Sequence, residues 1–302
     1  MFTARTRKVG LVVALFLSGT LLSACGSSDQ DASRDGNGTG RANVDAVTRD
    51  NANDSMNANA GPGTGSAREV ISERMPYAEV GEELVYGYFV APSDMFEPLP
   101  AVIMIHEWKG LNDNVRSMAD RLAAEGYIVL AVDLYGGKTA KTSAEARELM
   151  LSVTEDPEAA NDNIRSAFEF VSTTAGAPKV ASVGWRFGGT WALQAAMLLP
   201  DELDATVIYY AHVSADEDEL RPVDSPILGL FAGEDISIKA ASVEAFGTAL
   251  ERLRKDHEIH VYAGVSQTFA DPTSDHYDKA AATDAWGRML DFLGRHLSAD
   301  ES

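Results

Sequence analysis

The sequence predicts an α/β domain built on a mostly parallel, doubly wound sheet with helices on both faces. Continuous apolar runs, such as residues 101–105 and 227–231, recur along the chain and are typical of strands buried on both sides. Segments with apolar residues at helical spacing separate these runs, and the alternation indicates crossover connections between parallel strands. With 302 residues, of which 45% are hydrophobic, the chain is long enough to bury such a core.

Seven segments are predicted to form strands. The first, residues 84–90, alternates loosely between apolar and polar side chains, which favours an early antiparallel strand. The other six are apolar runs expected in the parallel part of the sheet, namely residues 101–105, 127–132, 180–185, 205–210, 227–231 and 259–262.

Five helices are predicted between or after these strands. Val115, Met118, Ala119 and Leu122 recur at helical spacing, and Gly126 stands where a C-terminal cap is expected. The other helices are expected at residues 164–171, 188–199, 243–253 and 282–293. Because ligands of open parallel sheets bind beyond the carboxyl ends of the strands, a functional site is expected at that edge.

The N-terminus predicts an exported lipoprotein. Basic residues at positions 5, 7 and 8 precede an apolar stretch, residues 9–22, that is short for a bilayer span. Residues 22–25, Leu-Ser-Ala-Cys, then resemble a bacterial lipobox, in which the cysteine is acylated and becomes the new N-terminus. Residues 1–25 are therefore interpreted as a lipoprotein signal peptide, with Cys25 as the lipidation site and membrane anchor. An ordinary signal peptide with an incidental cysteine is the alternative.

The position after Cys25 bears on sorting. Gly26 stands there, and no Asp follows the cysteine to indicate retention at the inner membrane. We therefore expect a membrane-anchored protein that faces the periplasm or the cell surface, at the outer membrane rather than the inner one. Residues 26–68 are rich in Asn, Asp, Gly and Ser and predict a disordered tether. Residues 69–298 are expected to form one folded domain.

Charge and composition exclude several partners. The formal net charge is −21, so the chain repels nucleic acid, and no nucleic-acid partner is expected. The sequence contains no Gly-rich phosphate loop, no paired-cysteine motif and no His-x-x-x-His spacing. We therefore predict no metal and no nucleotide cofactor.

One motif carries most of the functional information. It follows a predicted strand and opens a predicted helix, with the sequence Gly184-Trp185-Arg186-Phe187-Gly188-Gly189. Flanking glycines in this context are typical of a nucleophile elbow, whose tight turn lifts the central side chain above the sheet. The elbow of a hydrolase carries Ser, Cys or Asp at its centre, whereas this sequence carries Arg186.

Four further segments follow predicted strands and complete a family pattern. They are His106-Glu107-Trp108, Asp133-Leu134-Tyr135, Gly233-Glu234-Asp235 and Gly264-Val265-Ser266-Gln267-Thr268-Phe269. Together with the elbow, they resemble the dienelactone hydrolase family of the α/β-hydrolase superfamily across nearly the whole domain. The resemblance implies the α/β-hydrolase fold and hydrolysis of a carboxylic ester or lactone through a covalent acyl-enzyme.

The same resemblance implies roles for individual residues. Asp235 is the retained acid of the triad, and Glu107 is the retained glutamate that contacts the nucleophile thiol. Arg186 stands at the position of the nucleophilic Cys, and Gln267 stands at the position of the base His. Arginine stays protonated at physiological pH and glutamine cannot take up a proton, so neither residue can perform the triad role of the one it replaces.

An oxyanion hole is expected to survive these replacements, with the backbone N–H groups of Phe187 and Trp108 as donors. Three hypotheses for the function of the site around Arg186 and Gln267 stay open. Arg186 pairs with Glu107 or Asp235 and fills an inert pocket; the site binds a small-molecule carboxylate without turnover; or an ester or lactone is hydrolysed by a non-standard site. In the last reading, His106 or His212, both at predicted strand ends, acts as the base.

Overall fold

The computed structural model describes residues 68–80 and 83–298. The predicted signal peptide with Cys25, and the predicted tether up to residue 67, lie outside the described residues. In the described part of the chain, no helix is long and apolar enough to cross a membrane.

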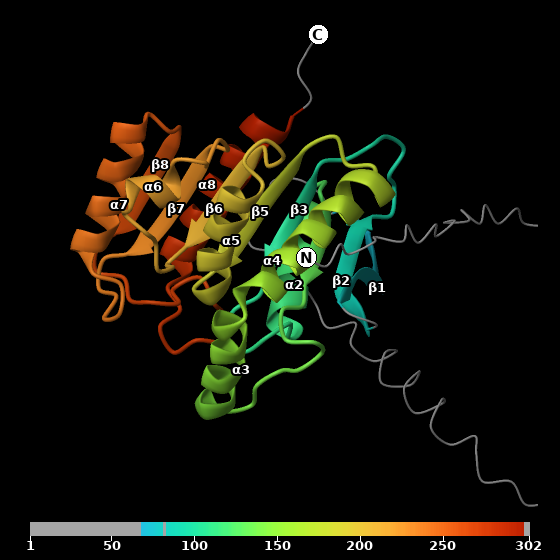
Figure 1. The fold of residues 1–302 in the computed structure, drawn as a ribbon, viewed down its shortest axis with the longest axis horizontal. Helices are drawn as coiled ribbons and strands as arrows, with labels where there is room; N and C mark the ends of the chain where they lie inside the picture. The colour runs from blue at the N-terminus through green and yellow to red at the C-terminus, as the bar shows by residue number, and fades with distance from the viewer. Residues whose placement is uncertain (1–67, 81–82, 299–302) are drawn as a thin grey trace, which may run out of the picture. The chain divides into compact units, whose positions relative to one another are not determined.

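Eight strands form one sheet in the order β1-β2-β4-β3-β5-β6-β7-β8 (Figure 1). β1 and β2 pair antiparallel with each other and β2 pairs antiparallel with β4, while all the other neighbours are parallel. The predicted mostly parallel sheet is therefore confirmed. The strand bounds are β1 Val70–Val80, β2 Glu83–Pro92, β3 Ala101–Ile105, β4 Ile128–Val132, β5 Val180–Trp185, β6 Ala205–Tyr209, β7 Ile227–Ala232 and β8 His257–Tyr262.

Each of the five predicted helices is present, but α4 begins at Pro157, seven residues before the expected start at residue 164. α5 begins directly at Phe187, immediately after Arg186. The helix bounds are α2 Asp113–Ala124, α3 Ser143–Glu155, α4 Pro157–Glu169, the π-helical turn η1 Phe170–Thr174, α5 Phe187–Leu198, α6 Glu217–Leu220, α7 Ala240–Leu253 and α8 Lys279–Leu297.

Three elements are not anticipated from the apolar pattern, namely β1, α3 and the single helical turn α6. β1 is an edge strand whose side chains are largely exposed, and its register shifts between Pro76 and Ala78, so no clean alternation marks it. α3 buries only Ala146 and Val153, which leaves too narrow an apolar stripe to predict a helix. Its start does carry a local signal, a capping box between Thr142 and the residue three positions later.

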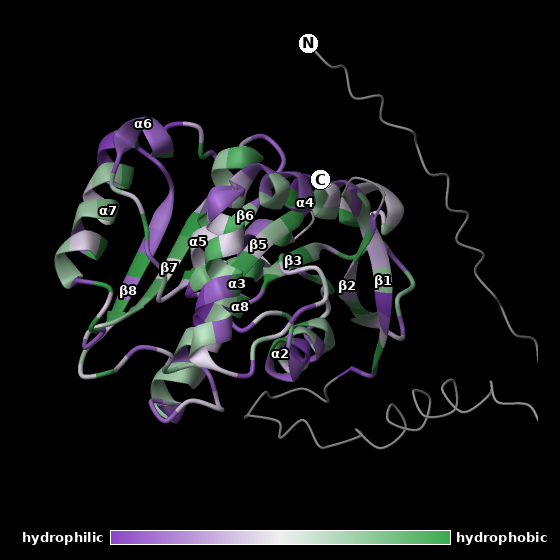
Figure 2. Cartoon of the chain, turned by 60° about the horizontal axis from the view of Figure 1, so that its bottom comes forward, coloured by the Kyte–Doolittle hydropathy of each residue, from purple (hydrophilic) through white to green (hydrophobic). Residues whose placement is uncertain are grey.

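Helices cover both faces of the sheet, as predicted. Alternate residues of the central strands point to opposite faces, so Met104 packs with α2 and α8, whereas its neighbour Ile103 packs with α4 and α5. A third apolar cluster joins α7 to β6 and β7. The central strands are accordingly hydrophobic along their length, and the short α6 is hydrophilic (Figure 2).

The topology explains why distant segments meet. β3, β5, β7 and β8 are mutually parallel, so their carboxyl ends lie at one edge of the sheet. The loops that leave those four ends carry Glu107, Arg186, Asp235 and Gln267, respectively.

Candidate active site

The turn between β5 and α5 has the backbone of an elbow. Arg186 has φ 49° and ψ −113°, a left-handed conformation that costs a non-glycine residue free energy. Its N–H donates to the carbonyl of Tyr209 at 3.0 Å, and its carbonyl accepts from the N–H of Thr190 at 3.0 Å. Contacts to β6 and α5 therefore hold the residue in this conformation, with its side chain at the sheet edge.

The glycines of the motif allow close backbone packing. A Cβ at Gly184 would lie 2.1 Å from the Gly188 carbonyl oxygen, and a Cβ at Gly188 would lie 2.1 Å from the Ile105 carbonyl oxygen. Only glycine lets the start of α5 approach β3 and β5 this closely.

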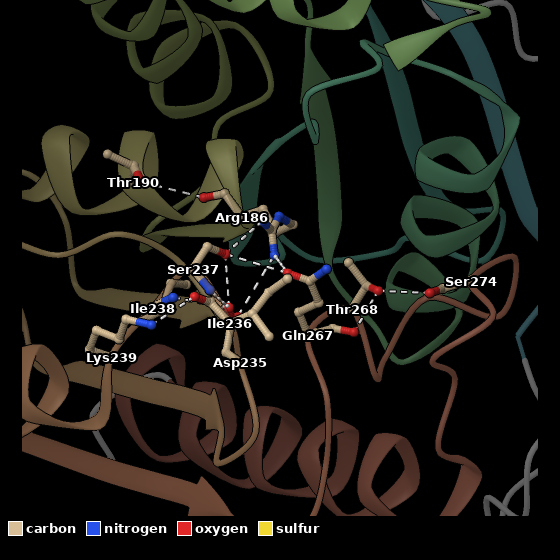
Figure 3. A network of polar contacts seen from close by, with 10 residues as sticks. All are labelled: Arg186, Thr190, Asp235, Ile236, Ser237, Ile238, Lys239, Gln267, Thr268 and Ser274. Carbon is tan, nitrogen blue, oxygen red and sulfur yellow. Dashed lines mark hydrogen bonds and ion pairs between the residues drawn. The ribbon is translucent and has the colours of Figure 1, made fainter.

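The Arg186 guanidinium lies against side chains of two loops, the one after β7 and the one after β8 (Figure 3). Its Nη1 donates to Gln267 Oε1 at 3.2 Å, and its Nη2 donates to Ser237 Oγ at 3.2 Å. Nη1 also lies 3.8 Å from Asp235 Oδ2. The side chain of Arg186 is 24% exposed and that of Asp235 is 1% exposed, so this ion pair is largely shielded from water.

Asp235 has one satisfied carboxylate oxygen and one unsatisfied one. Oδ1 accepts from the Ser237 N–H at 2.8 Å, from Ser237 Oγ at 2.8 Å and from the Ile238 N–H at 3.0 Å. Oδ2 is buried and has no hydrogen-bond donor in the described part of the chain. The loop thus fixes the carboxylate by one oxygen and presents the other, unbonded, toward Arg186.

Ser237 is the residue of this network that motif reasoning overlooks. Its hydroxyl donates to Asp235 and accepts from Arg186, and it lies 3.4 Å from Gln267 Oε1. A signal was present, because a serine two residues after an aspartate at a strand end commonly closes a side-chain-to-backbone turn.

Glu107 lies at the end of β3 and is 8% exposed. Burial raises the pKa of Glu107 to about 7; the charge of Asp271 acts in the same direction, and Arg186 acts against it. Burial likewise raises the pKa of Tyr210 well above its usual value, with Glu107 adding to the effect. The Tyr210 hydroxyl is buried without a hydrogen-bond partner in the described residues. Arg186 forms its ion pair with Asp235, and burial keeps Glu107 protonated up to about pH 7.

The two histidines considered as bases have different surroundings. His106 is fully buried, and each of its ring nitrogens is already engaged with the backbone, so neither is free to take a substrate proton. His212 is exposed beyond the end of β6, and its carbonyl accepts from Thr190 Oγ1 at 2.9 Å. Across the described residues, no group of three or more His, Cys, Asp or Glu side chains is placed to hold a metal ion.

Comparison with known proteins places this geometry in a family. The sequence profile of the dienelactone hydrolase family matches residues 85–297. The chain belongs to the dienelactone hydrolase family. It is similar to a carboxymethylenebutenolidase homologue from Saccharolobus solfataricus, with 32% identity over 235 residues that cover 66% of this chain and 90% of that one. Protein usf from Aquifex pyrophilus is 30% identical over 206 residues, covering 66% of this chain and 89% of its own length.

Solved structures agree on the fold. A dienelactone hydrolase homologue from Klebsiella pneumoniae superposes with a TM-score of 0.69 at 24% identity, covering 76% of this chain and all of that one. A dienelactone hydrolase-like promiscuous phosphotriesterase from metagenomic libraries gives a TM-score of 0.70 at 21% identity, covering 76% of this chain and 99% of that one. The predicted α/β-hydrolase fold is confirmed.

Proposed function

We propose that this dienelactone hydrolase homologue does not turn over an ester but binds a small carboxylate at its elbow. The observation that carries the proposal is the position of Arg186, a guanidinium on an elbow backbone at the N-terminus of α5. In the family motif this position holds the attacking group and position 267 holds the base. Neither residue present here can attack a carbonyl or accept a proton.

The proposed ligand follows from the donors that converge on the elbow. Arginine has five N–H donors, and two hydrogen bonds of Arg186 are made within the network described above, so donors remain for a carboxylate. Phe187 is the first residue of α5, so its N–H has no partner within the helix. A helix N-terminus and a guanidinium together favour an anion over a neutral ester.

Glu107 is expected to make this binding pH-dependent. Its pKa of about 7 means that it carries a negative charge above neutral pH and a proton below it. An anion beside Glu107 is repelled by the charged form only. Carboxylate affinity should therefore rise as the pH falls through about 7.

We expect small carboxylates to raise the melting temperature of the full-length chain with Cys25→Ser, which stays unacylated. At a ligand concentration of about 100 times Kd, the gain is about 2.7 kcal/mol, or roughly 5–10 °C for a domain of this size. The measurement is a thermal shift with acetate, propionate and benzoate at pH 6 and pH 8, and the pH 6 shifts should be the larger.

Two controls make this test specific. The corresponding neutral amides should give no shift, and Arg186→Gln, which keeps hydrogen bonding but removes the charge, should abolish the shift by the acids. If none of the carboxylates stabilises the protein, the proposal fails, and Arg186 serves only to neutralise Asp235 in a closed pocket.

A second candidate function is ester or lactone hydrolysis by a non-standard site. The observation that favours it is Glu107, because a buried carboxyl with a pKa of about 7 suits general acid–base catalysis. Product release from aryl esters by the wild-type chain, removed by Glu107→Gln, would support this candidate over the binder.

We also propose that the protein is exported and anchored through Cys25. The basic residues, apolar stretch and lipobox-like tetrapeptide at positions 22–25 support it. Cys25→Ser should move the protein from the detergent-soluble membrane fraction to the aqueous fraction and remove acyl labelling, as read by fractionation and labelling with a fatty-acid analogue. Unchanged partition of this variant would contradict the anchor, and Ser27→Ala, two residues away, serves as the control.

A further inference from the structure

The peptide between Glu107 and Trp108 is held by unusually many donors. The Glu107 carbonyl accepts from His106 Nδ1 at 2.7 Å and from the Gly110 N–H at 3.0 Å. No described peptide bond is cis, so the Trp108 N–H points the opposite way from the Glu107 carbonyl. The two donors that fix the direction of the Glu107 carbonyl therefore also fix the direction of the Trp108 N–H, because both groups belong to one planar peptide.

The hydrogen bonds of His106 select one tautomer. The Leu134 N–H donates to His106 Nε2 at 3.1 Å, so Nε2 must carry a lone pair. The ring proton then lies on Nδ1, from which it is donated to the Glu107 carbonyl. Burial lowers the pKa of His106, which keeps the ring neutral. Tyr135 and Phe187 lie against the ring, with centroids 4.5 Å and 6.2 Å away, and fix its plane.

The next two carbonyls of the same loop are also held. Tyr135 Oη donates to the Trp108 carbonyl at 3.1 Å, and the Ala140 N–H donates to the Lys109 carbonyl at 2.9 Å. Three consecutive carbonyls are therefore bound, the first by groups of its own loop and the next two by the loop that follows β4. Rotation of the Glu107–Trp108 peptide would break two hydrogen bonds and leave a buried imidazole donor without an acceptor.

We propose that His106 is a positioning residue that holds the Trp108 N–H toward the elbow, where it acts with the Phe187 N–H as a preset two-donor site for an oxyanion or carboxylate. The assignment of the ligand class rests on the proposed function. The positioning itself rests on the hydrogen bonds of the loop and is independent of whether a ligand is bound. His106 acts here through Trp108 and touches no ligand.

The first test reads the tautomer without any ligand. Nitrogen-15 NMR of the imidazole in the Cys25→Ser chain at pH 7.5 should show the His106 proton on Nδ1, with a bare Nε2. A proton on Nε2, or rapid exchange between the two tautomers, would overturn the proposal whatever the protein binds.

The second test compares two variants that each keep one half of the imidazole. In His106→Asn the amide nitrogen stands near Nδ1 and keeps the donor to Glu107, whereas in His106→Gln the amide oxygen stands near Nε2 and keeps only the acceptor for Leu134. Both should lose stability. Only the Gln variant should also lose function, by about tenfold or more in carboxylate affinity.

The same pair is then placed in the Arg186→Cys, Gln267→His background. There, kcat for an aryl ester should fall about 10–100-fold in the Gln variant with KM little changed, because an oxyanion donor acts on the transition state. Equal losses in both variants, in proportion to stability, would overturn the positioning role. If the parent chain binds no carboxylate but the tautomer and the kcat difference are as expected, the proposed function fails and this inference holds.

Discussion

Arg186→Cys combined with Gln267→His is expected to create an aryl-ester hydrolase, with kcat/KM at least about 100-fold above that of the wild-type chain. The geometry for this gain is present. Position 186 already has an elbow backbone at the start of α5, and Asp235 Oδ2 is a buried acceptor that finds no donor among the described residues. Removing the guanidinium vacates the space beside that oxygen, and a histidine at position 267 would donate to it.

Three matched variants test this expectation in p-nitrophenyl acetate hydrolysis by the Cys25→Ser chain. Arg186→Ala with Gln267→His supplies the base without a nucleophile and should stay at the wild-type rate. Arg186→Cys alone should gain little, because no base takes the thiol proton. Adding Asp235→Asn to the active pair should remove most of the gain. If the wild-type chain already hydrolyses the ester and the pair does not improve on it, the assigned triad positions are wrong, and Glu107 becomes the residue to test.

Glu107→Gln is expected to change how stability depends on pH. In the unfolded chain this carboxyl has its ordinary pKa of 4.5, and in the folded chain the pKa is about 7. Between these values the folded state holds the extra proton, so Glu107 makes the protein less stable as the pH rises through that window. From pH 5 to pH 8 the loss amounts to roughly 2–3 kcal/mol, and it should disappear when a neutral glutamine replaces the acid.

Urea unfolding of wild type and variant at pH 5, 6.5 and 8 measures this difference. The free energy of unfolding of Glu107→Gln, relative to wild type, should rise by roughly 2–3 kcal/mol across the series. Glu244→Gln, on an exposed position of α7, is the control and should show no comparable trend. A wild-type curve parallel to that of Glu107→Gln would mean that Glu107 is ionised throughout.

Much of the fold can be predicted from local patterns of apolar residues because these patterns show which side chains are buried. All six segments expected in the parallel sheet form strands, and five of them are buried at every position, since a strand covered on both faces needs apolar side chains throughout. The sixth, β8, is a partly exposed edge strand. β1 and α3 are not predicted in this way because they are mostly exposed to solvent, so their apolar residues do not recur at strand or helix spacing. The elbow can be predicted for a different reason. Gly184 and Gly188 stand where any Cβ would collide with backbone atoms, so the motif must carry glycine at these positions.

The hydrogen-bond and ion-pair partners of the site residues are harder to predict from the sequence, because they depend on distances between loops that are far apart in the chain. Arg186 had two acidic candidates, and only the folded chain puts Asp235 Oδ2 at 3.8 Å from its Nη1. The spacing of Ser237 from Asp235 indicates a local turn, but only the folded chain brings its hydroxyl to Arg186 and Gln267. The ring nitrogens of His106 are bound by backbone groups at positions 107 and 134, which only the packing of β3 beside β4 brings together.

The sequence by itself determined the architecture, the glycine pattern of the elbow and the residue types at positions 186 and 267, because side-chain chemistry and burial periodicity are local properties. The tertiary structure alone decided that the guanidinium of Arg186 lies against Asp235, that Glu107 is buried enough to hold its proton near pH 7, and that the Glu107–Trp108 peptide is bound in one orientation. Those three outcomes depend on desolvation and on hydrogen bonds across the sheet edge, and both exist only once the strand ends have been brought together.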